Sequence, residues 1–342
     1  MFTYFIHRVL IMIPTLFAIS VLTFIIIQLP PGDFLTNQIE ELKSQGEPAA
    51  AEKLEFLRQQ HGLDKPKIEQ YAAWVGLWPN PEGRLSGLLQ GDLGWSFEHN
   101  QPVSAIVGER LLMSFLVSFS TIVFIYLVSF PIGIYSATHQ YSWGDYGLTF
   151  LGFIGLAMPN FLLALVLLYI ANVVFGTSVS GLMDPRYIDQ PWSMGKVMSV
   201  LEHLWIPVIV IGASGTAGMI RRLRANLLDE LQKQYVVTGR AKGLPPGRLL
   251  MKYPLRMALN PFIADIGNLL PHVISGAAIV SVVLGLQTTG PMLLQALQSL
   301  DTYLAGSFLM FLALLTVIGV FVSDLLLAVL DPRIRLGAGA TK

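Results

Sequence analysis

The sequence predicts an all-helical integral membrane protein that crosses the bilayer six times. Only 13% of the 342 residues are charged, against about 25% in an ordinary soluble domain, and 53% are hydrophobic. The apolar residues also gather in six runs with few or no charges. A helix needs about 20 such residues to cross a hydrocarbon core of about 30 Å, so each run is a candidate span.

The first candidate span is residues 9–29, an uncharged run that follows Arg8. A secretory signal would have a shorter apolar region and a small-residue cleavage site, whereas this run ends at Pro30 and Pro31. We therefore expect a retained anchor helix within residues 1–29.

Five further spans are expected within residues 111–137, 147–175, 204–220, 261–284 and 303–325. One proline lies inside each of the first five spans: Pro14, Pro131, Pro159, Pro207 and Pro271. Proline frees backbone groups that neighbouring helices or a water-filled path must satisfy. The prolines therefore indicate either hinges of a gated pathway or the ordinary tolerance of proline in membrane helices.

Orientation is predicted from the connection between the fourth and fifth spans. Residues 221–256 contain nine basic and two acidic residues, a net charge of +7. Such loops face the cytoplasm, so six spans place both termini inside and residues 30–110 outside. The predicted domains are the anchor at 1–29, an outer helical insertion at 30–110, a five-helix core at 111–330 with its loop at 221–256, and a cytoplasmic tail at 331–342.

Two amphipathic helices are expected in the outer segment. The first begins at Pro48 and stops at Gly62. The second carries four apolar residues at spacings of three and four, which are Ile68, Tyr71, Trp74 and Trp78. This face is either an interfacial belt or docking surface, or, as is more usual for periodic apolar faces, the packed core of a small cap.

Several classes of function are excluded or disfavoured by the residues. A net charge of +0 gives no broad basic surface for nucleic acid, and the absence of cysteine excludes thiolate catalysis and cysteine-based metal sites. The only Gly-Lys pair, Gly195 and Lys196, is not part of a phosphate-binding loop, and the H-E-x-x-H and G-x-S-x-G patterns are absent. We expect no catalytic residue and no metal ligand in this chain, which cannot be its own ATPase.

Coupling to an ion gradient would require titratable residues within the membrane. His272 lies well inside a hydrophobic run, and Asp265 and Asp324 lie near predicted span ends, whereas Glu202 and His203 flank the outer mouth of the fourth span. A lone histidine in such a run is more often a packing residue than a proton relay. An ion-coupled transporter or channel using His272 or Asp265 stays open as an alternative, as does a non-transporting scaffold.

The basic connection also predicts a short helix with a sharp stop. Gly243 can end a helix, and Pro245 and Pro246 prevent its continuation. A short cationic helix of this kind is suited to insertion into a groove on a cytoplasmic partner. A solvated, positively charged loop is the equally weighted alternative.

Motifs along the whole chain resemble the permease subunits of ATP-binding-cassette importers of the oligopeptide, dipeptide and nickel class. The matching segments are Tyr4 to Arg8 with Ile13, Pro14 and Thr15; Pro31 to Asp33; His61 to Pro66; Gly91 to Phe97; Pro131 to Gly133; Met158 to Phe161; and Asp331 to Ile334. Their order and spacing together make the resemblance specific. The turn at 286–292, which contains Gln287, Thr288, Thr289, Gly290 and Pro291, departs from the usual pattern and implies a different outer gate.

The basic connection resembles the EAA loop of that family, whose coupling helix docks on an ATPase subunit. The residues at the matching positions are Val237, Thr238, Gly239, Arg240, Ala241, Lys242 and Gly243. Gly239 replaces the usual alanine, at a cost of up to about 1 kcal/mol in a helix interior. We expect a partner to compensate for this cost.

The resemblance implies the type I permease fold of ABC importers and an assembly in the bacterial inner membrane. The implied partners are a second homologous permease, two cytoplasmic ATPases that bind ATP and Mg²⁺, a periplasmic solute-binding protein and the lipid bilayer. This chain itself would bind no cofactor. The implied solute is a peptide or a similar small molecule, with oligosaccharides and opine-like compounds as further possibilities.

Overall fold

The computed structural model is mostly helical and describes residues 2–80, 83–176, 180–188, 190–266, 269, 273–274 and 277–330. The chain divides into two compact units. Unit 1 contains the described parts of residues 1–9, 113–287 and 316–342, and unit 2 those of residues 10–112 and 288–315. The predicted domain boundaries stay a prediction.

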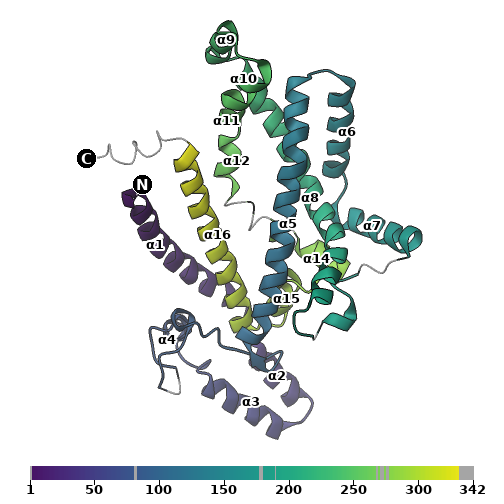
Figure 1. The fold of residues 1–342 in the computed structure, drawn as a ribbon. Helices are drawn as coiled ribbons and strands as arrows, with labels where there is room; N and C mark the ends of the chain where they lie inside the picture. The colour runs from purple at the N-terminus through teal and green to yellow at the C-terminus, as the bar shows by residue number, and fades with distance from the viewer. Residues whose placement is uncertain are drawn as a thin grey trace. The chain divides into compact units, whose positions relative to one another are not determined.

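Residues 2–138 contain five α-helices and one small antiparallel hairpin in the part that the structure describes (Figure 1). These elements are α1 (Phe2–Ile27), α2 (Phe34–Ser44), α3 (Pro48–Gln60), α4 (Lys67–Val75), the 3-10 helix η1 (Leu88–Gln90), β1 (Trp95–Ser96), β2 (Gln101–Pro102) and α5 (Val103–Thr138).

The remaining elements form two long helices and several shorter ones. They are α6 (Trp143–Ala157), α7 (Asn160–Phe175), the 3-10 helix η2 (Pro185–Tyr187), α8 (Met194–Leu231), α9 (Gln234–Ala241), α10 (Pro246–Lys252), α11 (Pro254–Ala258), α12 (Asn260–Ala264), α14 (Ala278–Leu284), α15 (Thr289–Gln298) and α16 (Thr302–Leu330).

Four described helices are long and apolar enough to cross a membrane, namely α1, α5, α8 and α16. Two bent pairs, α6 with α7 and α14 with α15, raise the number to six if each pair is one span. The structure therefore supports a membrane protein with four to six spans. The count of six stays a prediction.

The third and fourth predicted spans differ from the observed helices. The predicted span 147–175 is two helices that meet at an angle of 105° at Met158 and Pro159. The predicted short span 204–220 lies inside α8, which has 38 residues, because the polar residues at its two ends continue the helix. Pro14, Pro131 and Pro207 lie inside continuous helices, so Pro159 alone among these described prolines marks a break. Pro271 lies outside the described residues.

Unit 1 is built around α8, against which α5 and α6 pack through small residues. A Cβ atom added to Gly212 would lie 2.7 Å from the Phe124 ring, and one added to Gly215 would lie 2.8 Å from Ile125 Cδ1. Gly155 of α6 similarly approaches Ala213. Small residues at these crossings let membrane helices approach closely, so van der Waals packing can hold them together in lipid.

Unit 2 has its own apolar core, to which residues 30–110 contribute. Trp74 of α4 is only 6% exposed and packs beside the Phe24 ring at a centroid distance of 5.8 Å. The prediction that Ile68, Tyr71, Trp74 and Trp78 form one apolar face of this helix is wrong for Ile68 and Trp78. Ile68 is 82% exposed, and α4 stops before Trp78 because Gly76 adopts a left-handed conformation with φ +92°.

Helix α2 was not expected from the sequence, whereas α3 begins at the predicted Pro48. Asp33 is the N-cap of α2 and accepts a hydrogen bond from the Thr36 N–H at 2.8 Å. Leu35 and Ile39 lie one turn apart and are buried. Both signals were present in the sequence.

The hairpin is fixed to the start of α16 by a buried carboxyl group. Asp301 is 0% exposed and accepts hydrogen bonds from Ser96 Oγ at 2.6 Å and Leu304 N–H at 3.2 Å. Ser299 Oγ also donates to Glu98 at 2.5 Å. Burial raises the pKa of Asp301 above its ordinary value.

Candidate functional site

The residues expected to contact an ATPase lie in α9 and the turn after it. In unit 1, α9 and α10 lie beyond the end of α8, at the same end as the loop that joins α5 to α6 (Figure 1). The eight-residue α9 begins three residues after α8 ends, and Pro246 is the first residue of α10. The predicted helix is therefore present and ends close to the predicted glycine.

One side of α9 is packed within the chain itself. Val236 is 1% exposed, and Gly239 is also buried. A Cβ atom added to Gly239 would lie 2.5 Å from Leu249 Cδ1 in α10. The expectation that a partner compensates for Gly239 is therefore incomplete, because the close contact with Leu249 already favours glycine at this position.

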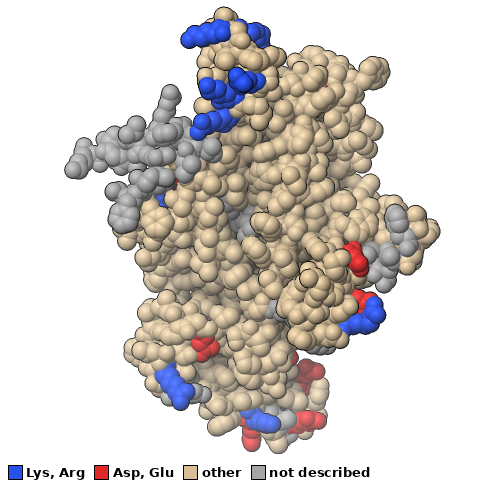
Figure 2. All heavy atoms as spheres, in the orientation of Figure 1, with Lys and Arg blue, Asp and Glu red and all other residues tan. Residues whose placement is uncertain are grey.

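The other side of α9 is exposed. Val237 is 53% exposed, and Thr238, Arg240, Ala241 and Lys242 are exposed as well. Figure 2 shows Lys and Arg side chains gathered over α9 and α10. These cations include Arg240, Lys242, Arg248 and Lys252. The site is therefore a small surface with apolar and cationic residues, which suits a protein partner with an acidic groove.

Gly243 stands in the turn that follows α9. Its φ of +77° is a left-handed conformation that other residues adopt with strain. A Cβ atom added there would meet nothing within 4 Å. The turn thus needs glycine for its backbone, and the space beside it is open to a partner.

Helix α9 is held to the end of α8 by neighbouring side chains. Tyr235 Oη donates a hydrogen bond to the Glu230 carboxylate. Burial and this carboxylate raise the pKa of the Tyr235 hydroxyl. Leu223 and Leu227 of α8 are fully buried in the same region. A displacement of α9 is therefore expected to move the end of α8.

Two ion pairs connect this end of α8 to neighbouring elements, and the sequence did not reveal them. Arg224 donates to Asp145 of α6 from Nη2 at 2.9 Å and from Nε at 3.2 Å. Asp145 is 2% exposed. Arg222 Nη1 donates to Asp265 at 3.1 Å. An aspartate at the start of a span was a visible signal, but sequence spacing could not identify its partner.

The candidates for ion coupling occupy ordinary structural positions. Asp265 pairs with Arg222, and Asp324 pairs with Arg8 at 3.0 Å. His203 is buried with Nδ1 2.7 Å from the Ser199 carbonyl oxygen. His272 lies outside the described residues. Asp265 and Asp324 are therefore each paired with an arginine and are poor candidates for proton carriers.

Comparison with known proteins shows a family match over nearly the whole chain. Residues 129–336 match the family of binding-protein-dependent transport system inner membrane components. Residues 1–120 match the N-terminal family of the same membrane components. The second match covers α1, residues 30–110 and the first part of α5.

Curated relatives of similar length carry names of peptide transport systems. The oligopeptide transport system permease protein AppB of Bacillus subtilis is 32% identical over 336 residues, which cover 98% of this chain and 100% of the relative. The di/tripeptide transport system permease protein DppB of Pseudomonas aeruginosa is 29% identical, covering 98% and 99%. The glutathione transport system permease protein GsiC of Pectobacterium atrosepticum is 30% identical with the same coverage.

The apolar helices, the exposed α9 surface and the family match over both parts of the chain agree with one another. A likeness of 30% or more along 98% of the sequence is far beyond a shared membrane composition. The chain therefore belongs to the family of binding-protein-dependent transport system inner membrane components, as a permease subunit of an ABC importer.

Proposed function

We propose that this permease carries a short peptide, or a similar small solute such as an oligosaccharide or opine, across the bacterial inner membrane. The names of the relatives support a peptide as the first choice, because they specify oligopeptides, di- and tripeptides or glutathione. The import would need a second homologous permease and a periplasmic solute-binding protein. Two cytoplasmic ATPases would bind ATP and Mg²⁺ and supply the energy, and this subunit would be non-catalytic.

The proposed topology has six spans, both termini in the cytoplasm and residues 30–110 in the periplasm. The net charge of +7 in residues 221–256 supports it, because loops rich in Lys and Arg remain inside. The exposed cations of α9 and α10 belong to this segment. The proposal therefore places α9 on the side where ATP is available.

The single observation that carries the coupling role is the two-sided character of α9. Val236 and Gly239 are buried against the chain, whereas the coupling surface, formed by Val237, Thr238, Arg240, Ala241, Lys242 and Gly243, is exposed. Because α9 is held to the chain along one side, it presents its exposed residues to a partner as one ordered surface. We propose that an ATPase subunit covers this surface.

Closure of the ATPases on ATP would then displace α9 as a rigid element. Helix α8 runs unbroken from Met194 to Leu231 and joins α9 through a short turn. The Arg224–Asp145 pair would make α6 follow α8. Such rigid-body rocking, rather than local unfolding, would open the path alternately to the two sides.

The test uses the complete transporter in lipid nanodiscs and proteoliposomes and compares two substitutions at one position. Gly243→Val forces a β-branched residue into a left-handed turn and into the proposed interface, whereas Gly243→Asn tolerates that backbone conformation. We expect Gly243→Val to abolish ATP-driven dipeptide uptake and Gly243→Asn to retain more of it. Gly247→Val is the matched control, because Gly247 has equally open space without a positive φ.

A second variant tests the surface without changing the backbone. Val237→Ser should weaken the coupling of ATP hydrolysis to uptake. Val197→Ser, which changes an exposed valine near the start of α8, should not. Wild-type uptake in both Gly243→Val and Val237→Ser, with normal amounts of protein in the membrane, would refute the coupling role. Uptake that persists without ATPases and collapses with the proton gradient would instead favour an ion-coupled transporter.

A further inference from the structure

The outer segment of unit 2 encloses a pocket of about 340 Å³ that the coupling role does not use. Its walls come from the loop before α4, from α4 itself, from the loops after it and from Tyr303 of α16. This volume lies at the lower end of the range for small-molecule sites. The pocket is therefore large enough for a small solute and too small for a helix of a partner protein.

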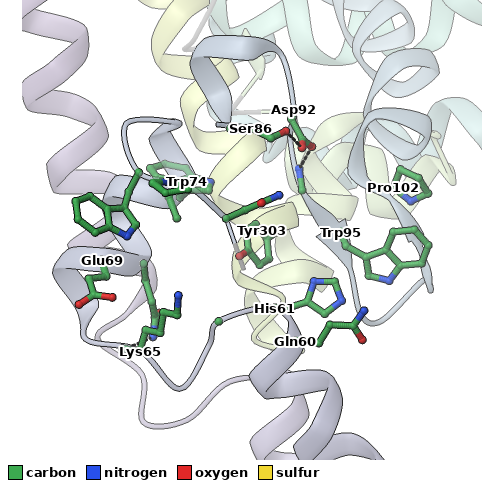
Figure 3. Close-up of a pocket in the computed structure, with 18 residues that line it drawn as sticks. Gln60, His61, Lys65, Glu69, Trp74, Ser86, Asp92, Trp95, Pro102 and Tyr303 are labelled. Atoms are coloured by element: carbon green, nitrogen blue, oxygen red, sulfur yellow. Dashed lines mark hydrogen bonds between the residues drawn. The ribbon is translucent and has the colours of Figure 1, made fainter. Parts of the chain in front are cut away.

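The two sides of the pocket differ in chemistry. Figure 3 shows Lys65 and Glu69 on one side and Trp95 and Pro102 on the other, with Tyr303 between them. Trp78, which is 51% exposed, adds another aromatic ring to the lining. The lining thus combines two opposite charges on one wall with aromatic surface on the other, beside polar groups such as Asp92 and Ser86.

Neither charge on this wall is neutralised by an ion pair within the part of the chain that the structure describes. Lys65 and Glu69 are half-buried, and among the described residues neither belongs to an ion pair, with each other or with a third group. By contrast, the pocket's Asp92 is occupied in its loop, since it accepts hydrogen bonds from Ser86 Oγ and from the Gly94 N–H at 2.9 Å. A cation and an anion at one wall suit a ligand that carries both charges.

The pocket wall is held in place by contacts that do not involve the two charges. Gln70 Nε2 donates to the Leu63 and Lys65 carbonyl oxygens at 2.9 and 2.7 Å, which fixes the loop carrying Lys65. Gly94, with φ +82°, lies so close to Tyr303 that an added Cβ atom would be 2.5 Å from the ring. A site whose walls are already ordered loses little conformational entropy when it binds a ligand.

We propose that this pocket binds the transported solute itself, as a short zwitterionic peptide, before the solute enters the membrane path. The carboxylate of the peptide would pair with Lys65 and its ammonium group with Glu69, while an apolar side chain would lie against the aromatic wall. A neutral sugar would use the rings but leave both charges unpaired. This inference rests on the proposed function, since it requires a peptide solute and a periplasmic outer segment.

The experiment uses the complete transporter in nanodiscs without its binding protein. The probe is alanyl-phenylalanine carrying a diazirine on its side chain, and mass spectrometry locates the labelled residues. We expect labelling at residues of this pocket, competed by unlabelled alanyl-phenylalanine and not by its acetylated and amidated form. Lys65→Gln and Glu69→Gln should each reduce labelling by about tenfold, the effect of losing one charge-assisted hydrogen bond. Lys53→Gln and Glu52→Gln, exposed on α3, are the matched controls.

Uptake of the same dipeptide into proteoliposomes, with the binding protein present, separates the two proposals. Peptide uptake without labelling of the pocket, or with labelling unchanged by Lys65→Gln and Glu69→Gln, overturns this inference and leaves the proposed function intact. A pocket that crosslinks to the binding protein but not to the peptide overturns it as well. Absence of both uptake and labelling for the wild-type transporter overturns both proposals.

Discussion

Gly239 of α9 and Leu249 of α10 approach each other so closely that a Cβ atom added to Gly239 would lie 2.5 Å from Leu249 Cδ1. Helices of eight and seven residues have little stability of their own in water. Their mutual packing, in which Val236 and Leu249 are buried, therefore holds the coupling surface in shape.

A larger residue at position 239 should separate the two helices. We expect Gly239→Val to cost about 1–3 kcal/mol through overpacking and to reduce the coupling of ATP hydrolysis to uptake. Leu249→Ala in the same chain should restore much of both, because it removes the clashing atom. The measurement is a double-mutant cycle on thermal unfolding and uptake. Additive effects of the two changes would show that the clash is not the cause.

A larger residue at the crossing of α5 and α8 should also be destabilising. Gly212 lies against Phe124, whereas Gly218 of the same helix has nothing within 4 Å of an added Cβ atom. We expect Gly212→Val to lower the melting temperature in detergent and Gly218→Val to leave it nearly unchanged. Equal shifts in the two variants would indicate a general effect of valine on α8 and not a loss of close packing.

The buried Asp145 should make its ion pair sensitive to removal of either partner. We expect Arg224→Gln to destabilise the fold by about 1–3 kcal/mol, because it leaves a charged carboxylate with 2% exposure. Asp145→Asn combined with Arg224→Gln should recover part of the loss. Unfolding of the purified protein in detergent measures both. A double variant as unstable as the sum of the single ones would contradict this explanation.

The loop before α8 should lose an ion pair in strong acid only. Arg186 donates to the Asp184 carboxylate from Nε at 3.0 Å and from Nη2 at 2.9 Å, which lowers the pKa of Asp184 to about 2. A lowered pKa stabilises the folded loop at pH values above the ordinary value, and this contribution disappears as the pH falls toward 2. Titration of the Asp184 carboxyl carbon by NMR should show the shift in the wild type, and Arg186→Gln should return it toward the ordinary value. An unshifted wild-type titration would refute the pair.

Much of the fold follows from residues that act locally. Apolar runs gave the membrane helices, Pro48 the start of α3, and Gly243 with its two following prolines the end of α9. The prolines predict hinges as one of two alternatives, and Pro159 does mark a bend, but the angle of that bend depends on packing that no local pattern encodes. Sequence periodicity also failed at α4, where the left-handed Gly76 ends the helix early and leaves Trp78 outside it.

The site was predictable only in part, for the same reason. The residues of α9 and of the turn after it could be named because their order in the chain resembles the EAA loop of the family. The advantage of glycine at position 239 depends on Leu249, and the role of Arg224 depends on Asp145 in another helix. Long-range pairs of this kind arise from tertiary packing and leave no periodic signal in a single sequence.

The bend between α6 and α7 also determines how the chain alternates between compartments. A bent pair that crosses the bilayer leaves Gln140 and Ser180 on opposite sides, whereas a pair that turns back leaves them on the same side. The side of the membrane on which each later loop lies depends on this choice. The turn at Pro159 therefore determines on which side of the membrane α9 lies. Because the chain contains no cysteine, Gln140→Cys and Ser180→Cys can each be labelled by an impermeant thiol reagent without any background. Under the proposed topology the two thiols react from opposite faces of the membrane.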